Sequence, residues 1–250
     1  MPFTFFHPAL VLPARYLPKK KKKYVSITGL IIGSVAPDFE KFMQMRGGNT
    51  YSHTFAGIFW YDLPVSILLA VTFHLVIKDT LINFLPINAL LARFQVYKNQ
   101  NWLLHLRRRY VIVVLSILLG ISSHLVLDSA THANGLLVKR FPILTNYYEV
   151  FSLNAQGYQL LEIWYYALSA AAIGWAFVSL PQEGHSPRSG SRQTALFWAG
   201  LITSSALIIY LRLLVSPFIR HIWDVASLTM AAGLISLFLS CLGWRWVAQR

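Results

Sequence analysis

Five apolar stretches of about twenty residues each constrain this chain more than any other feature of its sequence. An α-helix needs about 20 mostly apolar residues to cross the hydrocarbon core of a bilayer. The five stretches cover residues 55–77, 110–127, 158–180, 194–215 and 225–247. Hydrophobic residues make up 56% of the chain and charged residues only 12%, a balance that excludes an ordinary water-soluble domain. The sequence therefore predicts an all-α, polytopic transmembrane helical bundle.

Two shorter apolar segments precede the five long ones, and a run of lysines separates them. Residues 6–17 and 24–37 flank Lys19–Lys23, a run that must lie in water because charged side chains are costly in lipid. We therefore predict an antiparallel helical hairpin over residues 6–37, with its basic tip at an aqueous face. The basic run follows the apolar residues, which is the reverse of a secretory signal, so we do not expect this segment to be one.

The distribution of Lys and Arg predicts the orientation of the chain. If the apolar stretches alternate across the membrane, the side of Lys19–Lys23 carries 16 of the 22 basic residues and the other side carries 5, while Arg212 lies within a span. The positive-inside rule then places the lysine run in the cytoplasm, with the protein in the cell inner (plasma) membrane. The segments 38–54, 128–157 and 216–224 are expected on the outer face. Clustering of the basic residues beside apolar stretches favours membrane lipids as partners over nucleic acid, despite a net charge of +13.

The chain is expected to divide into two parts. Residues 1–157 carry the hairpin and the next two spans, and residues 158–250 carry the last three spans. Residues 181–193 are polar and rich in Gly and Ser, which predicts a flexible linker. The basic segment 78–109 has an apolar middle, so it suits either a helix lying in the membrane interface or a solvated loop.

The densest group of ionisable residues is the motif HLVLDSATH, at the end of the second long stretch. His124, Asp128 and His132 follow one another at a spacing of four, which places them within an arc of about 80° on one helix face. Imidazole and carboxylate groups on successive turns can converge on one metal ion. The alternative is a set of packed histidines with a capping aspartate. Because the apolar parts of the chain hold few other ionisable residues, we favour a metal site.

Helix lengths bring further donors to the same height in the membrane. Asp38 lies fifteen residues beyond the last lysine of the basic run, and His124 lies fifteen residues beyond Arg109, which is about 22 Å in either helix. His7 lies twelve residues before the first lysine, about 18 Å on the same basis. His53 precedes the next span on that side. Taken singly, His7 or His53 would suit an interfacial or capping role equally well. The predicted metal ligands are His7, Asp38, His53, His124, Asp128 and His132.

Four motifs, in order, resemble a known family. They are MPFTFFHPA at the N-terminus, GLIIGSVAPDFEKF, YSHTFAGIFWYDLP and GISSHLVLDSATH. Together they resemble the bacterial membrane-protein family described as domain of unknown function 4184, over roughly the first 135 residues. That family is in turn similar to the membrane-bound metal-dependent hydrolases of the LexA-regulated inner-membrane type. It is more remotely similar to zinc-dependent phospholipase C and the P1-type nucleases.

The resemblance implies functional roles for the same residues. It matches the early histidine with His7, the acid of the Pro-Asp pair with Asp38, the histidine of the Ser-His pair with His53, and the HxxxD pair with His124 and Asp128. His132 matches the closer family but is not a uniform feature of the wider group. The activity implied by the resemblance is metal-dependent hydrolysis.

Other polar residues near the spans are expected to be structural. Asp62 lies nine residues after the Ser-His histidine, on the opposite helix face unless Pro64 kinks the helix. Glu162 and Arg212 lie near the outer ends of their spans and are expected to pair. Glu40 suits either a carboxylate that orients a ligand histidine or an exposed loop acid.

These observations favour a membrane-bound, metal-dependent hydrolase acting on a phosphoester, most simply a lipid-linked one. A metal-activated water is the expected nucleophile, and Asp38 and Asp128 are the catalytic candidates, as a bridge between two ions or as general base. Six donors exceed the three or four protein ligands of one catalytic zinc, so we expect one or two divalent ions, zinc or manganese. The alternatives are a metal or ion transporter and a non-catalytic structural membrane protein.

Overall fold

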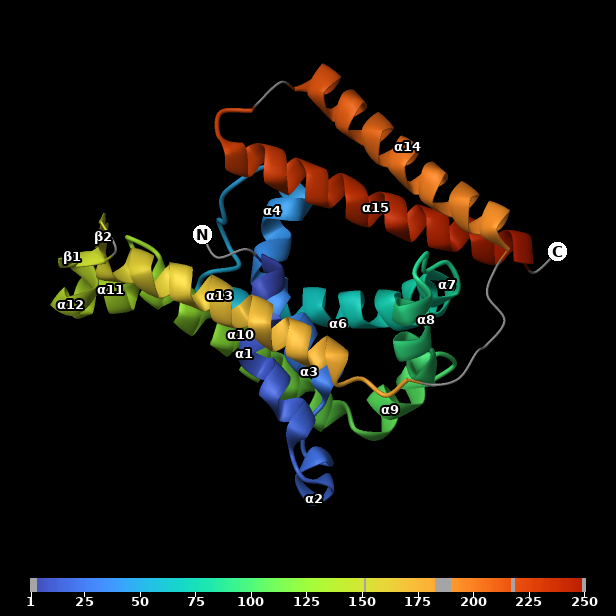
Figure 1. Cartoon of the computed structure of the whole chain (residues 1–250), viewed down its shortest axis with the longest axis horizontal. Helices are drawn as coiled ribbons and strands as arrows, with labels where there is room; N and C mark the ends of the chain where they lie inside the picture. Colours follow the sequence, from blue (N-terminus) through green and yellow to red (C-terminus); the bar gives the residue numbers. More distant parts are fainter. Residues whose placement is uncertain (1–3, 151, 183–189, 217–218, 249–250) are drawn as a thin grey trace. The chain divides into compact units, whose positions relative to one another are not determined.

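The computed structural model describes residues 4–150, 152–182, 190–216 and 219–248, and nearly all regular structure in them is helical (Figure 1). Among these described residues, five helices are long and apolar enough to cross a membrane: Phe55–Asn83, Tyr110–Thr131, Gly157–Val178, Ser191–Val215 and Ile222–Val247. Each coincides with one predicted stretch to within a few residues, except that the first continues past residue 77 to Asn83. The prediction of an all-α, multi-pass membrane protein is therefore confirmed.

The first long helix departs from regular α-helical geometry. It consists of α5 (Phe55–Gly57), α6 (Leu63–Thr72) and α7 (Lys78–Asn83), joined by π-helical segments at Ile58–Asp62 and Phe73–Ile77. A π-helical turn is wider than an α-helical one, so it changes the face on which the side chains lie. The sequence indicated only a kink at Pro64, and these π-helical segments were not predicted.

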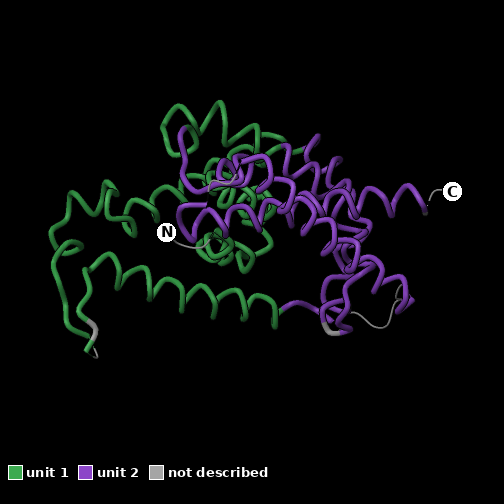
Figure 2. Tube along the Cα trace, turned by 90° about the horizontal axis from the view of Figure 1, so that it is seen from above, with its two compact units in different colours: residues 1–38, 51–67, 109–179 green, residues 39–50, 68–108, 180–250 purple. Residues whose placement is uncertain are grey.

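The chain forms two compact units, shown in different colours in Figure 2. Unit 1 comprises residues 1–38, 51–67 and 109–179, and unit 2 comprises residues 39–50, 68–108 and 180–250. All six predicted metal ligands belong to unit 1. The predicted division at residue 157 stays a prediction.

Unit 1 begins with the predicted hairpin. Its first arm is α1 (Pro8–Val11) with the 3-10 segment Leu12–Tyr16, and its second arm is α3 (Ile27–Val35), against which α1 packs. The lysine run itself forms an exposed helical turn, α2 (Lys19–Lys22), at the tip. Helix α10 (Tyr110–Thr131) begins beside this tip, where Arg109 Nη1 donates a hydrogen bond to the carbonyl oxygen of Lys23 over 3.2 Å.

Helices α3 and α10 run parallel from the tip. Near their starts, the main-chain N–H of Ser26 donates to Ser116 Oγ over 2.8 Å. Near the end of α3, the carbonyl oxygen of Ser34 lies 2.8 Å from Nδ1 of His124. Because both helices advance in step from one end, residues that follow α3 reach the same height as residues late in α10.

Glycines bring the backbones of α3 and α10 into direct contact. A Cβ on Gly33 would lie 2.3 Å from the carbonyl oxygen of Ile117, and a Cβ on Gly120 would lie 2.4 Å from that of Leu30. Neither position has room for a side chain. Small residues serve this purpose in transmembrane helix pairs, where packing supplies most of the attraction. The segment GLIIG, with glycines four residues apart, thus sets the spacing of the two helices that carry most of the candidate site.

The segment between α10 and α13 (Gly157–Val178) contains small elements that the sequence analysis did not predict. They are α11 (Leu136–Arg140), α12 (Pro142–Thr145) and an antiparallel hairpin of β1 (Tyr147–Val150) and β2 (Leu153–Gln156). In the register of the hairpin, Tyr147 lies opposite Gln156. A capping box starts α13: the side chain of Gln156 accepts a hydrogen bond from the main-chain N–H of Gln159, and the side chain of Gln159 accepts one from the main-chain N–H of Gln156.

Unit 2 contains the remaining helices. They are α4 (Phe39–Gln44), α8 (Asn88–Phe94), α9 (Trp102–Arg108), α14 (Ser191–Val215) and α15 (Ile222–Ala248). Helices α14 and α15 lie side by side and antiparallel (Figure 1). Phe84, Phe197 and Cys241 form the buried core of this unit, and Phe84 stacks on Phe197 with 4.6 Å between the ring centroids.

Two connections that were predicted from the sequence, residues 78–109 and 181–193, fall almost entirely in unit 2. The apolar part of segment 78–109 is not one interfacial helix: α7 ends at Asn83 and α8 begins at Asn88. Pro86 lies in this break, and Trp198 Nε1 donates to the carbonyl oxygen of Phe84 over 2.7 Å at the end of the first helix. Of the predicted linker 181–193, residues 183–189 lie outside the described residues.

Candidate metal centre

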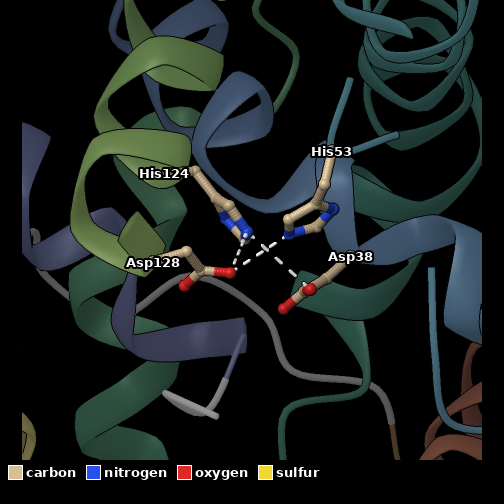
Figure 3. A group of neighbouring side chains, drawn as sticks. All are labelled: Asp38, His53, His124 and Asp128. Carbon is tan, nitrogen blue, oxygen red and sulfur yellow. Dashed lines mark hydrogen bonds and ion pairs between the residues drawn. The ribbon is translucent and has the colours of Figure 1, made fainter. Parts of the chain in front are cut away.

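Four side chains from three segments of unit 1 converge at the end of α3. They are Asp38, His53, His124 and Asp128 (Figure 3). Asp38 ends the 3-10 turn that follows α3, His53 lies in the turn before α5, and the other two lie one turn apart on α10. One ligand atom of each lies within 4.8 Å of the other three. The predicted equal height of Asp38 and His124 is thereby confirmed.

Three of the distances between the ligand atoms are close to those of a tetrahedral site, and all of them are within 4.8 Å. Nε2 of His53 lies 3.1 Å from Oδ2 of Asp128, and Nε2 of His124 lies 3.5 Å from the same oxygen. Nε2 of His124 also lies 3.7 Å from Oδ1 of Asp38. Ligands about 2.1 Å from a tetrahedral zinc ion are about 3.4 Å from one another. The donors therefore surround a space of the size that such an ion needs.

Neutral groups outside the cluster orient three of its members. Thr4 Oγ1 donates to Oδ2 of Asp38 over 2.5 Å, which leaves Oδ1 toward the cluster. Nδ1 of His53 lies 3.0 Å from Ser52 Oγ. Nδ1 of His124 donates to the carbonyl oxygen of Ser34, which can only accept, so Nε2 bears the lone pair of the neutral ring. Metal-binding histidines commonly use their second nitrogen in this way.

The environment of His124 Nε2 fits a divalent cation. The side chain is fully buried, and this nitrogen has no hydrogen-bond partner among the described residues. It faces the carboxylates of Asp38 and Asp128, which are also almost completely buried. Three groups with lone pairs facing each other in a dry site are unfavourable unless positive charge lies between them. One divalent ion would satisfy all four donors at once.

Comparison with known proteins places the chain in a family. Residues 1–248 match the family described as Domain of unknown function (DUF4184). The chain belongs to this family. The DUF4184 match includes the last three spans, beyond the first 135 residues in which the motifs were recognised. No curated protein and no solved structure matches the chain. The DUF4184 description names no activity, so the function must be argued from the site.

The two remaining predicted ligands of this DUF4184 chain lie beside the four-residue cluster. The ring of His7 stacks on that of His124 with 3.8 Å between centroids, and His7 Nε2 lies 3.6 Å from Oδ1 of Asp128. His132 is not on the helix face that its spacing predicted. Helix α10 ends at Thr131, and His132 has an extended backbone. Nδ1 of His132 donates to the carbonyl oxygen of Asp128 over 2.8 Å.

Two acidic residues outside the predicted ligand set are buried. Asp62 is fully buried at the end of its π-helical segment, which packs against the 3-10 turn containing Asp38 and against α10. Glu40 is buried in unit 2, so the exposed-loop alternative is wrong. Its Oε1 accepts hydrogen bonds from the main-chain N–H of Thr50 over 2.6 Å and from Gln44 Nε2 over 2.8 Å. Glu40 thus holds the loop that leads to His53.

Sequence reasoning missed the uncharged residues that support the cluster. Thr4, Ser52 and the carbonyl group of Ser34 orient its ligands, and the hydroxyl of Tyr165 donates to the carbonyl oxygen of Phe6 over 2.7 Å, next to His7. Only the serine before His53 and the paired glycines of GLIIG offered a local sequence signal. A threonine near the N-terminus or a tyrosine in a span offers none.

Proposed function

We propose that this protein is a membrane-bound, metal-dependent hydrolase that acts on a phosphoester, most simply a lipid-linked one. The observation that carries the proposal is the convergence of two imidazoles and two carboxylates on one space, with three of the distances between them close to those around a tetrahedral ion. Two nitrogen and two oxygen donors suit zinc, and manganese is the second choice.

The donor set supports hydrolysis by an activated water. A divalent cation held by such donors acts as a Lewis acid and lowers the pKa of water toward neutrality. Four protein donors fill a tetrahedral site, so the reacting water would bind as a fifth ligand or in place of one carboxylate, and Asp38 or Asp128 would accept its proton. Thr4 and the carbonyl group of Ser34 keep Asp38 and His124 in place, so little reorganisation is needed when a substrate arrives.

The exposure of the histidines supports access from one side. The side chains of His53 and His132 are 27% and 26% exposed, whereas that of His124 is fully buried. A phosphoester would therefore approach the cluster past His53 and His132. This open side gives the substrate a route to the two carboxylates without unfolding the helix contact behind them.

The chain that follows His132 supports a lipid as the substrate. Large apolar side chains in this segment are exposed: Leu136, Phe141, Ile143 and Tyr147. Lys139 and Arg140 are exposed between them. Apolar side chains interspersed with basic ones are typical of a segment that lies in the headgroup region of a bilayer. A lipid headgroup would thus meet the open side of the cluster at high local concentration.

The proposed location is the inner (plasma) membrane, with α2 in the cytoplasm and the metal centre toward the outer face. The support is the excess of basic residues on the side of α2. In this orientation the substrate is a lipid of the outer leaflet.

Metal content tests the proposal. We would measure zinc and manganese by mass spectrometry in detergent-purified wild type, His124→Ala, Asp128→Ala and His53→Ala, with folding checked by monodisperse elution. Stoichiometric metal in the wild type that falls at least tenfold in the variants is expected. His53 is partly exposed, so its variant remains informative if the buried ones fail to fold. The matched control is His74→Ala in unit 2, which should keep the metal.

Activity is then tested with vesicles of phosphatidylglycerol and phosphatidylethanolamine and with a soluble chromogenic phosphodiester. Hydrolysis that needs the metal and is lost in His53→Ala supports the proposal. Folded wild type that has been supplied with zinc and manganese and binds neither would remove its basis. The histidine cluster would then be a packing feature of a structural membrane protein.

A further inference from the structure

Four aromatic side chains are exposed in the part of unit 1 that carries His53. They are Tyr51, Phe55, Phe59 and Trp60, and Phe55 is 81% exposed. The rings contact one another edge to face in two pairs, Tyr51 with Trp60 at 5.4 Å between centroids and Phe55 with Phe59 at 5.6 Å. None of the exposed residues in segment 51–60 is charged. These four side chains (the aromatic surface) therefore present an uncharged, mostly apolar face.

A tight turn fixes the aromatic surface to the candidate metal centre. Thr54 Oγ1 donates a hydrogen bond to the carbonyl oxygen of Tyr51 over 2.8 Å and accepts one from the main-chain N–H of Gly57 over 2.9 Å. A Cβ on Gly57 would lie 2.0 Å from the carbonyl oxygen of Tyr51, so this position has no room for a side chain. His53 lies inside the turn, with its Nε2 3.1 Å from Oδ2 of Asp128. The aromatic surface and this candidate ligand thus belong to one short, closely held piece of chain.

The π-helical segment Ile58–Asp62 presents its side chains to two different sides. Phe59 and Trp60 are exposed, whereas Asp62, at the end of the same segment, is fully buried. Because a π-helical turn is wider than an α-helical one, two large rings can point outward while the only charged side chain of the segment points inward. Such segments are frequent at functional sites.

The chemistry of the aromatic surface fits the boundary between lipid and water. The surface lies at the start of a helix that is long and apolar enough to cross a membrane. Tyrosine and tryptophan combine an apolar ring with a polar hydroxyl or N–H group, and they gather where the hydrocarbon of a bilayer meets its headgroups. The two phenylalanines add apolar area, and no exposed charge in segment 51–60 opposes contact with acyl chains. Membrane lipid is therefore the occupant that these side chains suit.

We infer that the aromatic surface docks at the lipid–water boundary of the leaflet nearest the metal centre and holds lipid there with its headgroup beside His53. The inference rests on the proposed hydrolase function and deepens it, because it assigns the side chains that select a substrate held in the bilayer over a dissolved one. Contacts with parts of a substrate remote from the reacting bond contribute to its rate of reaction. A dissolved phosphoester with the same headgroup lacks these contacts and is expected to react more slowly.

Spin labels measure where the aromatic surface lies in the membrane. The variants are Phe55→Cys, Lys21→Cys and Leu119→Cys, each in a Cys241→Ala background, labelled and reconstituted in vesicles of phosphatidylglycerol and phosphatidylethanolamine. Lys21 is exposed in the basic tip, and Leu119 is exposed midway along α10. Accessibility to oxygen, which concentrates in hydrocarbon, is compared with accessibility to a water-soluble nickel complex. The label at residue 55 is expected at a depth between those of the other two.

Either extreme of depth would overturn the inference. A label at residue 55 that is as accessible to the nickel complex as the label at residue 21 would show that the aromatic surface faces water. A label as deep as the one at residue 119 would show that the surface lies within the hydrocarbon, away from the headgroups.

Hydrolysis tests whether the aromatic surface selects the substrate. The double variant Phe59→Ala/Trp60→Ala is compared with Trp175→Ala, which removes another exposed tryptophan of unit 1. Trp175 lies near the end of α13, next to the residue whose carbonyl oxygen accepts a hydrogen bond from Arg15, on the side of the basic tip. The substrates are long-chain phosphatidylglycerol in vesicles and dihexanoyl phosphatidylglycerol as dissolved monomers, which share one headgroup.

The ratio of the long-chain rate to the short-chain rate is expected to fall at least tenfold in the double variant and to change less than threefold in Trp175→Ala. An unchanged ratio in the folded double variant would overturn the role of the aromatic surface and leave the proposed hydrolase intact. A wild type that hydrolyses neither lipid overturns the selection of substrate together with the hydrolase. The depth of residue 55 is measured without metal or substrate, so it still decides whether the surface docks at the lipid–water boundary.

Discussion

The residues of the candidate metal centre are oriented by groups that carry no charge. The hydroxyl of Thr4 fixes one oxygen of Asp38, and the carbonyl group of Ser34 fixes the proton of His124 on Nδ1. Removing such a group leaves every ligand in the chain but lets its ring or carboxylate rotate. At the scale of single residues, the metal affinity of the proposed site is therefore expected to depend on groups that would not touch the ion.

Thr4→Val tests this dependence. Valine has the shape of threonine but cannot donate to Asp38, so metal affinity should fall about 10- to 100-fold. The fold should survive, because only one hydrogen bond is lost. Competition with a chromophoric chelator measures the affinity.

Thr203→Val is the control for Thr4→Val, since Thr203 Oγ1 donates to carbonyl groups of its own helix, those of Ala199 and Gly200. Equal affinity in wild type and Thr4→Val would show that Asp38 is oriented by other contacts.

The sequence predicts the candidate metal ligands better than it predicts the uncharged residues that orient them. His124 and Asp128 stood out because ionisable residues are rare in the apolar stretches, and Asp38 followed from counting helical residues. His132 was placed on the helix face because periodicity does not show that α10 ends at Thr131. The role of Thr4 could not be predicted, since it depends on a contact with Asp38, 34 positions away in the sequence.

Among the elements, the parallel pair α3 and α10 determines whether the centre can form. Helices α3 and α10 meet at Gly33 and Gly120, where any side chain would collide with a carbonyl oxygen of the other helix. A substitution there acts on the site through the distance between helices, although neither glycine is a ligand.

Gly33→Ala and Gly174→Ala should have opposite effects on stability. The new methyl group at residue 33 would lie 2.3 Å from the Ile117 carbonyl oxygen, so overpacking should cost roughly 1–3 kcal/mol and weaken metal binding. At residue 174, in α13, no atom lies within 4 Å among those described. Alanine there should stabilise the helix by up to about 1 kcal/mol. Thermal unfolding in detergent, with metal content measured in parallel, compares them; equal shifts would contradict the close contact.

The sequence predicts the long helices but not the smaller elements. The five long helices could be found because each is a continuous apolar run of sufficient length. The π-helical segments, the break at Pro86 and the small hairpin β1–β2 could not, because each depends on local backbone geometry that hydropathy does not encode.

For the whole molecule, the DUF4184 match covers both the part that carries the candidate metal centre and the last three spans. The orientation of the chain in the membrane is a property of the whole molecule, and chemical labelling can measure it directly. The sequence contains a single cysteine, Cys241, which is buried, so a background without cysteine needs only one substitution.

Lys21→Cys and Leu136→Cys, each in a Cys241→Ala background, test the orientation. Both positions are exposed, one in α2 and one in α11. A membrane-impermeant maleimide should label residue 21 only in inverted vesicles and residue 136 only in right-side-out ones, because positive charge is retained on the cytoplasmic side. The reverse pattern would contradict the proposed orientation.

In the proposed orientation, the basic tip formed by α2 would make access to the candidate metal centre depend on bilayer thickness. Helices α3 and α10 both start at the tip, so the donors stand about 22 Å from it in any lipid. An average hydrocarbon core is about 30 Å thick, which leaves the donors below its far boundary. Shorter acyl chains would bring that boundary down to the donors while the tip stays in water. Lipid length would then regulate how easily water and headgroups reach the centre.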